Sequence, residues 1–165
     1  MATGWFQRLF PANVTSEFSG RRIALWLFVP LTVVTLWRSQ HHLFAADGGA
    51  QSIAHIPLDA YPPAAEQTIV GVFALWGLSQ LILALLELLV LVRYRSLIPL
   101  FYLLTVFEYL MRGLVIPALK TIPTTAEAPG ALINLPMAAA ALVLLILSLW
   151  PTPSADPPVA PRTAA

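Results

Sequence analysis

Residues 68–120 read TIVGVFALWGLSQLILALLELLVLVRYRSLIPLFYLLTVFEYLMRGLVIPALK. Two apolar runs, at 68–92 and 96–119, flank a short basic turn at 93–95. Each run is longer than the roughly 20 residues that a helix needs to cross the hydrocarbon core of a bilayer. Lipid cannot hydrogen-bond to backbone groups, so runs of this kind fold there as helices. The stretch therefore predicts a transmembrane helical hairpin with its turn at one membrane surface.

The composition of the whole chain agrees with this hairpin. Of the 165 residues, 58% are hydrophobic and only 10% are charged, whereas soluble domains are about 25% charged. A net charge of +1, without a basic face, argues against nucleic acid as a partner. The absence of cysteine excludes disulfides, thiolate catalysis and cysteine-ligated metals. We therefore expect an integral membrane protein whose main partner is the lipid bilayer.

Two further apolar runs complete an all-α, four-transmembrane-helix bundle over residues 22–150. The first, RIALWLFVPLTVVTLWR at 22–38, is short for a span, and Pro30 should kink it. The last, ALINLPMAAAALVLLILSLW, covers 131–150. A cleaved signal peptide is an alternative interpretation of the first run, but Arg38 precedes any small-residue cleavage site.

The segments outside these four runs are not expected to cross the membrane. Residues 1–21 carry aromatic and apolar side chains at helical spacing, which predicts an amphipathic segment in the membrane interface. Residues 39–67 contain glycine and proline breakers and predict one solvated loop. His41, His42 and Asp47 in that loop match no metal-binding spacing, so no metal site is expected. The proline- and alanine-rich tail, 151–165, is expected to be disordered.

Basic residues predict the orientation of the bundle. In bacterial membrane proteins, lysine and arginine near the ends of the spans are enriched on the cytoplasmic side. One side of this chain carries Arg8, Arg21, Arg22, Arg93, Arg95 and Arg162. The other side carries only Arg38 and Lys120. Both termini are therefore expected to be cytoplasmic.

A polar cluster is predicted at bilayer depth inside the central hairpin. Gln80 and Glu108 lie thirteen residues from Arg93 and Arg95, respectively, which places both about 20 Å from the turn. By the same count Trp76 lies level with Arg112, which predicts a contact between the indole and the guanidinium. Ionisable groups at this depth face the protein interior or a partner charge.

The spacing of the polar residues predicts how this cluster is paired. Glu108 and Arg112 are four residues apart with the acid first, which favours an ion pair on one helix face. The side chains available locally to satisfy their remaining hydrogen bonds are Gln80, Thr105 and Tyr109; those at a plausible depth on other spans are Asn134 and either Thr32 or Thr35. Two interpretations stay open: a structural latch that locks the bundle, or the lining of an outward-opening cavity for a small polar or amphiphilic ligand.

Glu87 stands apart from this cluster. It lies only about 9 Å from the turn by helical rise, and no cation is found at its depth on the second or third run. We expect the carboxylate to extend toward Arg93 or Arg95; the alternative is a protonatable site within the membrane.

The layout resembles a known group of proteins. Four spans, Glu66 shortly before Gly71, Arg112 late in the third span, and the stretches RYRSLIPLFYLLTVFEYLMR and APGALIN are similar to an uncharacterised branch of the DoxX-like group of small bacterial membrane proteins. The resemblance implies a multi-pass bundle of the bacterial inner (cytoplasmic) membrane, sometimes an accessory subunit of a quinone-linked oxidoreductase. It supplies no catalytic residue.

The sequence shows no nucleophile and base pair, metal motif or phosphate-binding loop. We therefore expect a non-catalytic membrane subunit or a bundle that binds a lipophilic or other small ligand, without a cofactor. A membrane protein partner or a homo-oligomer fits the first version. One alternative is a small proton-coupled transporter that uses Glu87 or Glu108. A membrane-embedded enzyme is the weakest alternative, because these two carboxylates differ in depth by about 10 Å.

Overall fold

The computed structural model describes residues 4–152 and is all-α in this range. Its helices are α1 (Trp5–Leu9), α2 (Arg22–Phe44), η1 (Leu58–Ala60), α3 (Pro63–Val92), η2 (Arg95–Leu97), α4 (Ile98–Leu110), η3 (Met111–Val115), α5 (Ile116–Leu119) and α6 (Pro129–Leu149). The pieces from η2 to α5 form one continuous rod, Arg95–Leu119. Together with α2, α3 and α6 it gives four helices that are long and apolar enough to cross a membrane, as predicted. Most of the predicted tail lies outside the described residues.

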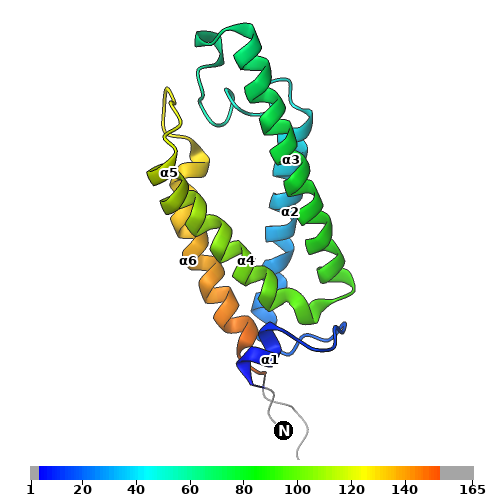
Figure 1. The fold of residues 1–165 in the computed structure, drawn as a ribbon. Helices are drawn as coiled ribbons and strands as arrows, with labels where there is room; N and C mark the ends of the chain where they lie inside the picture. Colours follow the sequence, from blue (N-terminus) through cyan, green and yellow to red (C-terminus); the bar gives the residue numbers. More distant parts are fainter. Residues whose placement is uncertain (1–3, 153–165) are drawn as a thin grey trace, which may run out of the picture.

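The four long helices associate as two pairs (Figure 1). α2 packs mainly along α3, and α4 packs mainly along α6. The pairs meet at the end of the molecule that carries α1, which we call the termini end. They separate toward the opposite end, where the connections 45–62 and 120–128 lie and which we call the loop end.

An aromatic core holds the two pairs together at the termini end. Phe28 of α2 meets Phe101 and Tyr102 of α4 edge to face, with ring centroids 6.2 and 5.5 Å apart. The Tyr102 hydroxyl donates a hydrogen bond to the Ala24 carbonyl at 2.6 Å. Edge-to-face pairs of this kind stabilise a core by about 0.5–1.5 kcal/mol beyond the area that they bury. The two pairs are therefore packed against each other at the termini end.

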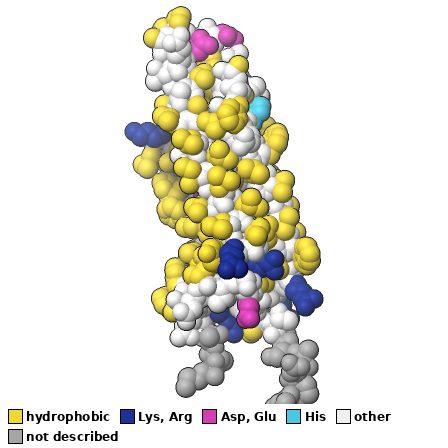
Figure 2. Space-filling model, turned by 90° about the vertical axis from the view of Figure 1, so that its right-hand side faces the viewer, with side chains coloured by type: hydrophobic (Ala, Val, Ile, Leu, Met, Phe, Trp, Pro, Cys, Tyr) yellow, Lys and Arg dark blue, Asp and Glu magenta, His cyan; other side chains and the backbone are white. Residues whose placement is uncertain are grey.

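The outside of the bundle is apolar along most of its length. Figure 2 shows hydrophobic side chains over the middle of the molecule, several Lys and Arg side chains gathered toward the termini end, and acidic side chains at the loop end. Leu75, Ile82 and Leu85 of α3 are each more than half exposed. An exposed apolar surface of this extent suits lipid, and the chain is a four-span membrane protein.

α2 is longer than the sequence predicts. It ends at Phe44, six residues beyond the expected end of the first span. Ser39 and His42 are buried at 0% and 3% exposure, so the prediction of a solvated loop over 39–67 is wrong for its first residues. The reason lies on α3, where Gly77 leaves room for α2: a Cβ there would lie 2.7 Å from the Leu43 amide nitrogen.

The rest of that connection is folded as well. The Asp47 carboxylate accepts hydrogen bonds from the amides of Gly49, Gln51 and Ser52 at 2.9, 3.1 and 2.7 Å. Burial alone would raise the pKa of Asp47, but these bonds outweigh it and lower the pKa to about 2. Ala50, Ile56 and Leu58 are buried beneath the connection in a small apolar cluster of their own.

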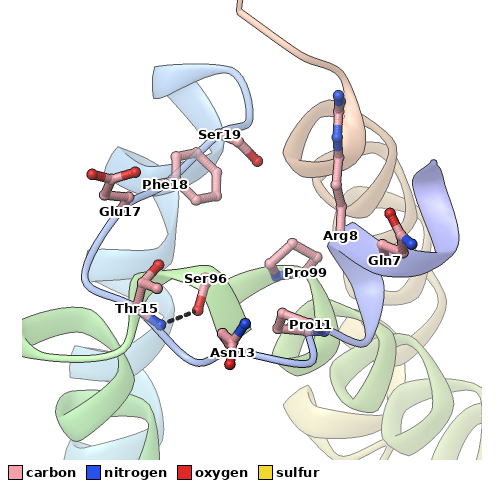
Figure 3. Close-up of a pocket in the computed structure, with 10 residues that line it drawn as sticks. All are labelled: Gln7, Arg8, Pro11, Asn13, Thr15, Glu17, Phe18, Ser19, Ser96 and Pro99. Carbon is pink, nitrogen blue, oxygen red and sulfur yellow. Dashed lines mark hydrogen bonds between the residues drawn. The ribbon is translucent and has the colours of Figure 1, made fainter. Parts of the chain in front are cut away.

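The N-terminal segment packs on the termini end. α1 is only five residues long; Leu9 is buried, whereas Trp5 and Phe6 are exposed. Figure 3 shows the segment passing over η2 and the start of α4; the Thr15 amide donates to the hydroxyl of Ser96 in η2 at 2.9 Å. A shallow cavity of about 230 Å3 lies under it. The interfacial location of residues 1–21 stays a prediction.

Candidate functional site

Arg38 of α2 connects three helices in the middle of the bundle. Its Nε donates to Oε1 of Gln80 on α3 at 3.2 Å, and one terminal nitrogen donates to the Tyr109 hydroxyl on α4 at 3.2 Å. Its other terminal nitrogen lies 3.7 Å from Oε1 of Glu108, also on α4. Arg38 thus forms an ion pair and two hydrogen bonds across helix boundaries.

The sequence prediction placed Arg38 at the outer membrane surface, and this is wrong. The extension of α2 to Phe44 leaves Arg38 six residues inside the helix, about 9 Å from its end by helical rise. The available signal was the lack of glycine or proline between Arg38 and Asp47. Without a breaker in that range, the helix had no local reason to stop.

A second guanidinium shares the same carboxylate. Arg112 donates to Oε1 of Glu108 at 3.2 Å, as the i, i+4 spacing predicts. Its guanidinium carbon lies 5.4 Å from the centre of the Trp76 ring, and that of Arg38 lies 5.9 Å from it. Both distances are within the range of a cation–π contact. Trp76 therefore contacts both cations, and the predicted contact with Arg112 is present.

The cluster formed by Arg38, Gln80, Glu108, Tyr109 and Arg112 contains two guanidiniums and one carboxylate. Within residues 4–152, Glu108 is the only acid that lies within 4.0 Å of either guanidinium. All three charged side chains are partly shielded, with 19% of Arg38, 22% of Arg112 and 33% of Glu108 exposed. The two guanidiniums of the cluster therefore share one carboxylate at close range, and the next acid, Glu87, interacts with Arg38 from farther away.

The backbone changes its geometry at Arg112. Residues Met111–Val115 form the π-helical turn η3. Pro117 offers a local cause, because it has no amide hydrogen and its ring would clash with the carbonyl of Gly113 in a regular α-helix. π-Helical turns often occur at functional sites. Gly113 also permits close contact with α6, since a Cβ there would lie 3.2 Å from that of Asn134.

A cavity of about 360 Å3 opens beside Arg112 at the loop end. Its walls come from both helix pairs and from the connections, and most are apolar. Residues that contribute apolar surface are Ile53, Ile56, Phe73, Ile116, Pro117 and Ile122. The side chains that can be charged at its edge are Arg112, Lys120 and Glu127. An apolar chamber with a few polar groups is the usual form of a site for a small molecule.

Two further predicted site residues are Asn134 and Thr105. Asn134 of α6 is 5% exposed and lines the cavity, and its Oδ1 has no hydrogen-bond partner among the described residues. Thr105 is buried, but its hydroxyl donates to Phe101 of its own helix at 2.9 Å. It is therefore next to the ion pairs in sequence without bonding to them.

Glu87 does not reach the membrane surface. It is 3% exposed, contacts the Thr35 side chain, and has an Oε2 without a hydrogen-bond partner among the described residues. Arg95 instead donates to the Leu91 carbonyl at 2.9 Å. The predicted extension of Glu87 toward the turn is therefore wrong, because the carboxyl faces α2. The transporter alternative stays a prediction.

His42 contributes to the wall behind Trp76. The two rings lie 4.4 Å apart, and His42 Nδ1 is 2.8 Å from the Gly48 carbonyl oxygen. No group of three or more His, Asp or Glu side chains within residues 4–152 has a geometry that would hold a metal ion. The structure therefore assigns His42 to packing.

No family model, curated protein or solved structure matches this chain. The resemblance to the DoxX-like group accordingly stays a prediction.

Proposed function

We propose that this protein is a non-catalytic membrane protein that binds a lipophilic small molecule in the loop-end cavity, alone or as a subunit of a larger complex. The observation that carries the proposal is the cavity itself, about 360 Å3 of largely apolar space beside an ion cluster. Sites for small molecules commonly measure about 300–1,000 Å3 and combine apolar walls with few polar groups.

A purely structural role, holding the helices together, explains the presence of Arg38 better than that of Arg112. Arg38 joins α2 to α3 and α4, so it explains why the helix pairs stay together. Arg112 is bonded to a residue of its own rod and lines the cavity. A charged side chain inside a membrane is costly in free energy, so a further role for Arg112 is expected, and contact with a ligand would be such a role.

The proposal is tested by filling the cavity. Ala131 lines it, whereas Ala139 lies on the exposed surface of the same helix and is absent from the lining. We predict that Ala131→Trp weakens the binding of dodecanol to the purified protein by about tenfold or more, roughly 1.4 kcal/mol, because the indole occupies the space of the chain. The measurement is isothermal titration in a neutral detergent.

Ala139→Trp is the matched control and should bind dodecanol as the wild type does. Absence of saturable dodecanol binding to the wild-type protein would contradict the proposed function. Equal loss of binding in both variants would show that bulk anywhere on α6 disturbs the bundle, and the cavity would then not be the site.

We further propose that the termini end faces the cytoplasm of a bacterial inner membrane. Support comes from the arginines that flank the spans at this end, at positions 21, 22, 93 and 95. The inner membrane location rests on the resemblance to the DoxX-like group.

A further inference from the structure

We propose that the cavity selects an amphiphile with an anionic headgroup, a carboxylate or a phosphate, which is held between Arg112 and the first turn of α6. This inference rests on the proposed function and adds the charge of the ligand to it. Its three supports are a guanidinium that shares its carboxylate with Arg38, a helix end without a side-chain cap and a buried amide, all at the same cavity.

The first support is the charge balance around the cavity. Lys120 and Glu127 at its edge offset one another. Deeper in the bundle, Arg38 and Arg112 share Glu108, and buried Glu87 interacts with Arg38 at longer range, so Arg112 has no carboxylate of its own. A guanidinium in this position within a membrane is costly, and a ligand anion would provide Arg112 with a partner.

The Arg112 guanidinium also has N–H donors that Glu108 does not use. A guanidinium carries five N–H groups. Within the described residues, Arg112 donates one hydrogen bond, to Glu108. An incoming anion can use the others in the two-pronged arrangement that arginine forms with carboxylates and phosphates. Glu108 would keep Arg38, which already lies 3.7 Å from the same oxygen.

The second support is the start of α6, which opens onto the same space. Ala128 precedes the helix and provides no side-chain cap. Pro129 has no amide hydrogen and the Ala131 amide donates to the Ala128 carbonyl at 2.8 Å, so the Gly130 amide is the first-turn donor without a partner among the described residues. Ala128, Gly130 and Ala131 all line the cavity. The terminal NH2 nitrogen of Arg112 lies 3.8 Å from the point where a Gly130 Cβ would stand. The guanidinium and the positive end of a 21-residue helix therefore converge, which favours an anion.

The third support is independent of these charges. Asn134 lies one turn further along α6, lines the cavity and is 95% buried, and its Oδ1 has no partner among residues 4–152. Buried amide groups normally have a hydrogen-bond partner. Oδ1 accepts, so a headgroup that also carries a hydroxyl, such as a singly ionised phosphate, would donate to it, while the apolar walls receive the chain.

The test compares two probes that share a chain and differ in charge. Dodecanoate and dodecanol are titrated at pH 8 into the purified full-length protein in neutral detergent. We expect dodecanoate to bind at least about tenfold more tightly, a ratio that isothermal titration resolves. Acetate and inorganic phosphate are titrated as free anions, and weak or absent binding is expected because they cannot use the apolar walls.

Two variants locate the headgroup. Arg112→Gln should bring the ratio of dodecanoate to dodecanol affinity close to one, because the charged partner of the headgroup is lost while Glu108 keeps Arg38 as its partner. Gly130→Leu leaves all charges in place and adds bulk beside Arg112, so it should weaken dodecanoate specifically even if Arg112→Gln fails to fold. Lys120→Gln, at the cavity edge, is the charge-matched control and should keep most of the preference.

The outcomes separate this inference from the proposed function. Equal affinity of the wild type for the two probes would overturn the headgroup site and leave a lipophile-binding bundle. Binding of neither probe would overturn the proposed function and this inference together. Binding of acetate or phosphate as tightly as dodecanoate would show a site for free anions and overturn the assignment to an amphiphile.

Discussion

At the scale of single residues, Arg38 has the most consequence for the fold. One side chain bonds to Gln80 on α3 and to Tyr109 on α4, and forms an ion pair with Glu108. Arg112, in contrast, bonds to Glu108 within one rod. Loss of Arg38 therefore removes two hydrogen bonds and an ion pair between helices, whereas loss of Arg112 removes an ion pair within one rod and a cation–π contact with Trp76 of α3.

We predict that Arg38→Leu lowers the free energy of unfolding in detergent by about 1–3 kcal/mol, because Gln80 and Tyr109 lose a charged partner. The value is below that of a fully buried pair, since 19% of the Arg38 side chain and 33% of that of Glu108 are exposed. Thermal unfolding followed by circular dichroism measures the change. Arg112→Leu serves as the comparison and should cost less. A larger loss for Arg112→Leu than for Arg38→Leu would contradict the assigned roles.

The sequence was sufficient to predict those cluster contacts whose depth in the membrane is set by a nearby turn. The turn at 93–95 sets the relative depths of α3 and α4, so the proximity of Trp76 to Arg112 could be derived by counting residues. Arg38 could not be placed in this way. Its depth depends on where α2 ends, and that end is set by contact with another helix.

At the scale of elements, this contact is the close approach of α2 to α3 at Gly77. A Cβ at that position would lie 2.7 Å from the Leu43 nitrogen and 2.9 Å from the His42 carbonyl carbon. Backbone atoms cannot yield as a flexible side chain can, so any larger residue would force the helices apart. The register of Arg38 against Gln80 follows from this packing.

We predict that Gly77→Val lowers the free energy of unfolding by about 1–3 kcal/mol, the usual cost of overpacking. Gly71→Val is the matched control, because it places the same side chain on the same helix where nothing lies within 4 Å. The same unfolding assay applies to both. Similar stabilities of the two variants would mean that the α2 and α3 contact at Gly77 is not tight.

The sequence predicted the long elements and missed the finer ones. Length and hydropathy were enough for the four spans, because lipid demands helices. The fold of the 45–62 connection could not be read in the same way, since it depends on three amides converging on Asp47. The π-helical turn at Arg112 needs both Pro117 and contact with α6, and only the first is visible in a sequence.

At the scale of the whole molecule, the orientation in the membrane decides which solution the cavity adjoins. The arginines that flank the spans at the termini end predict that this end is cytoplasmic and that the loop end is external. A ligand would then reach the cavity from the external side or from the outer half of the bilayer.

Reporter fusions measure this orientation. We predict that a fluorescent protein at the C-terminus is bright and that alkaline phosphatase there is inactive, because phosphatase folds only outside the cytoplasm. Alkaline phosphatase inserted within the 120–128 connection should be active. The opposite pattern would invert the topology and place the cavity on the cytoplasmic side.

The two connections at the loop end are bonded to each other through Thr125 and His55. The amide and the hydroxyl of Thr125 both donate to the His55 carbonyl, at 2.9 and 3.3 Å, and so join the two connections above the cavity. The aromatic core lies at the far end of the same pairs. The two helix pairs are therefore joined at three levels, by the Phe28 core, by Arg38 with Glu108 and Tyr109, and by Thr125 with His55, so loss of the Thr125 contact alone would leave them connected below the cavity.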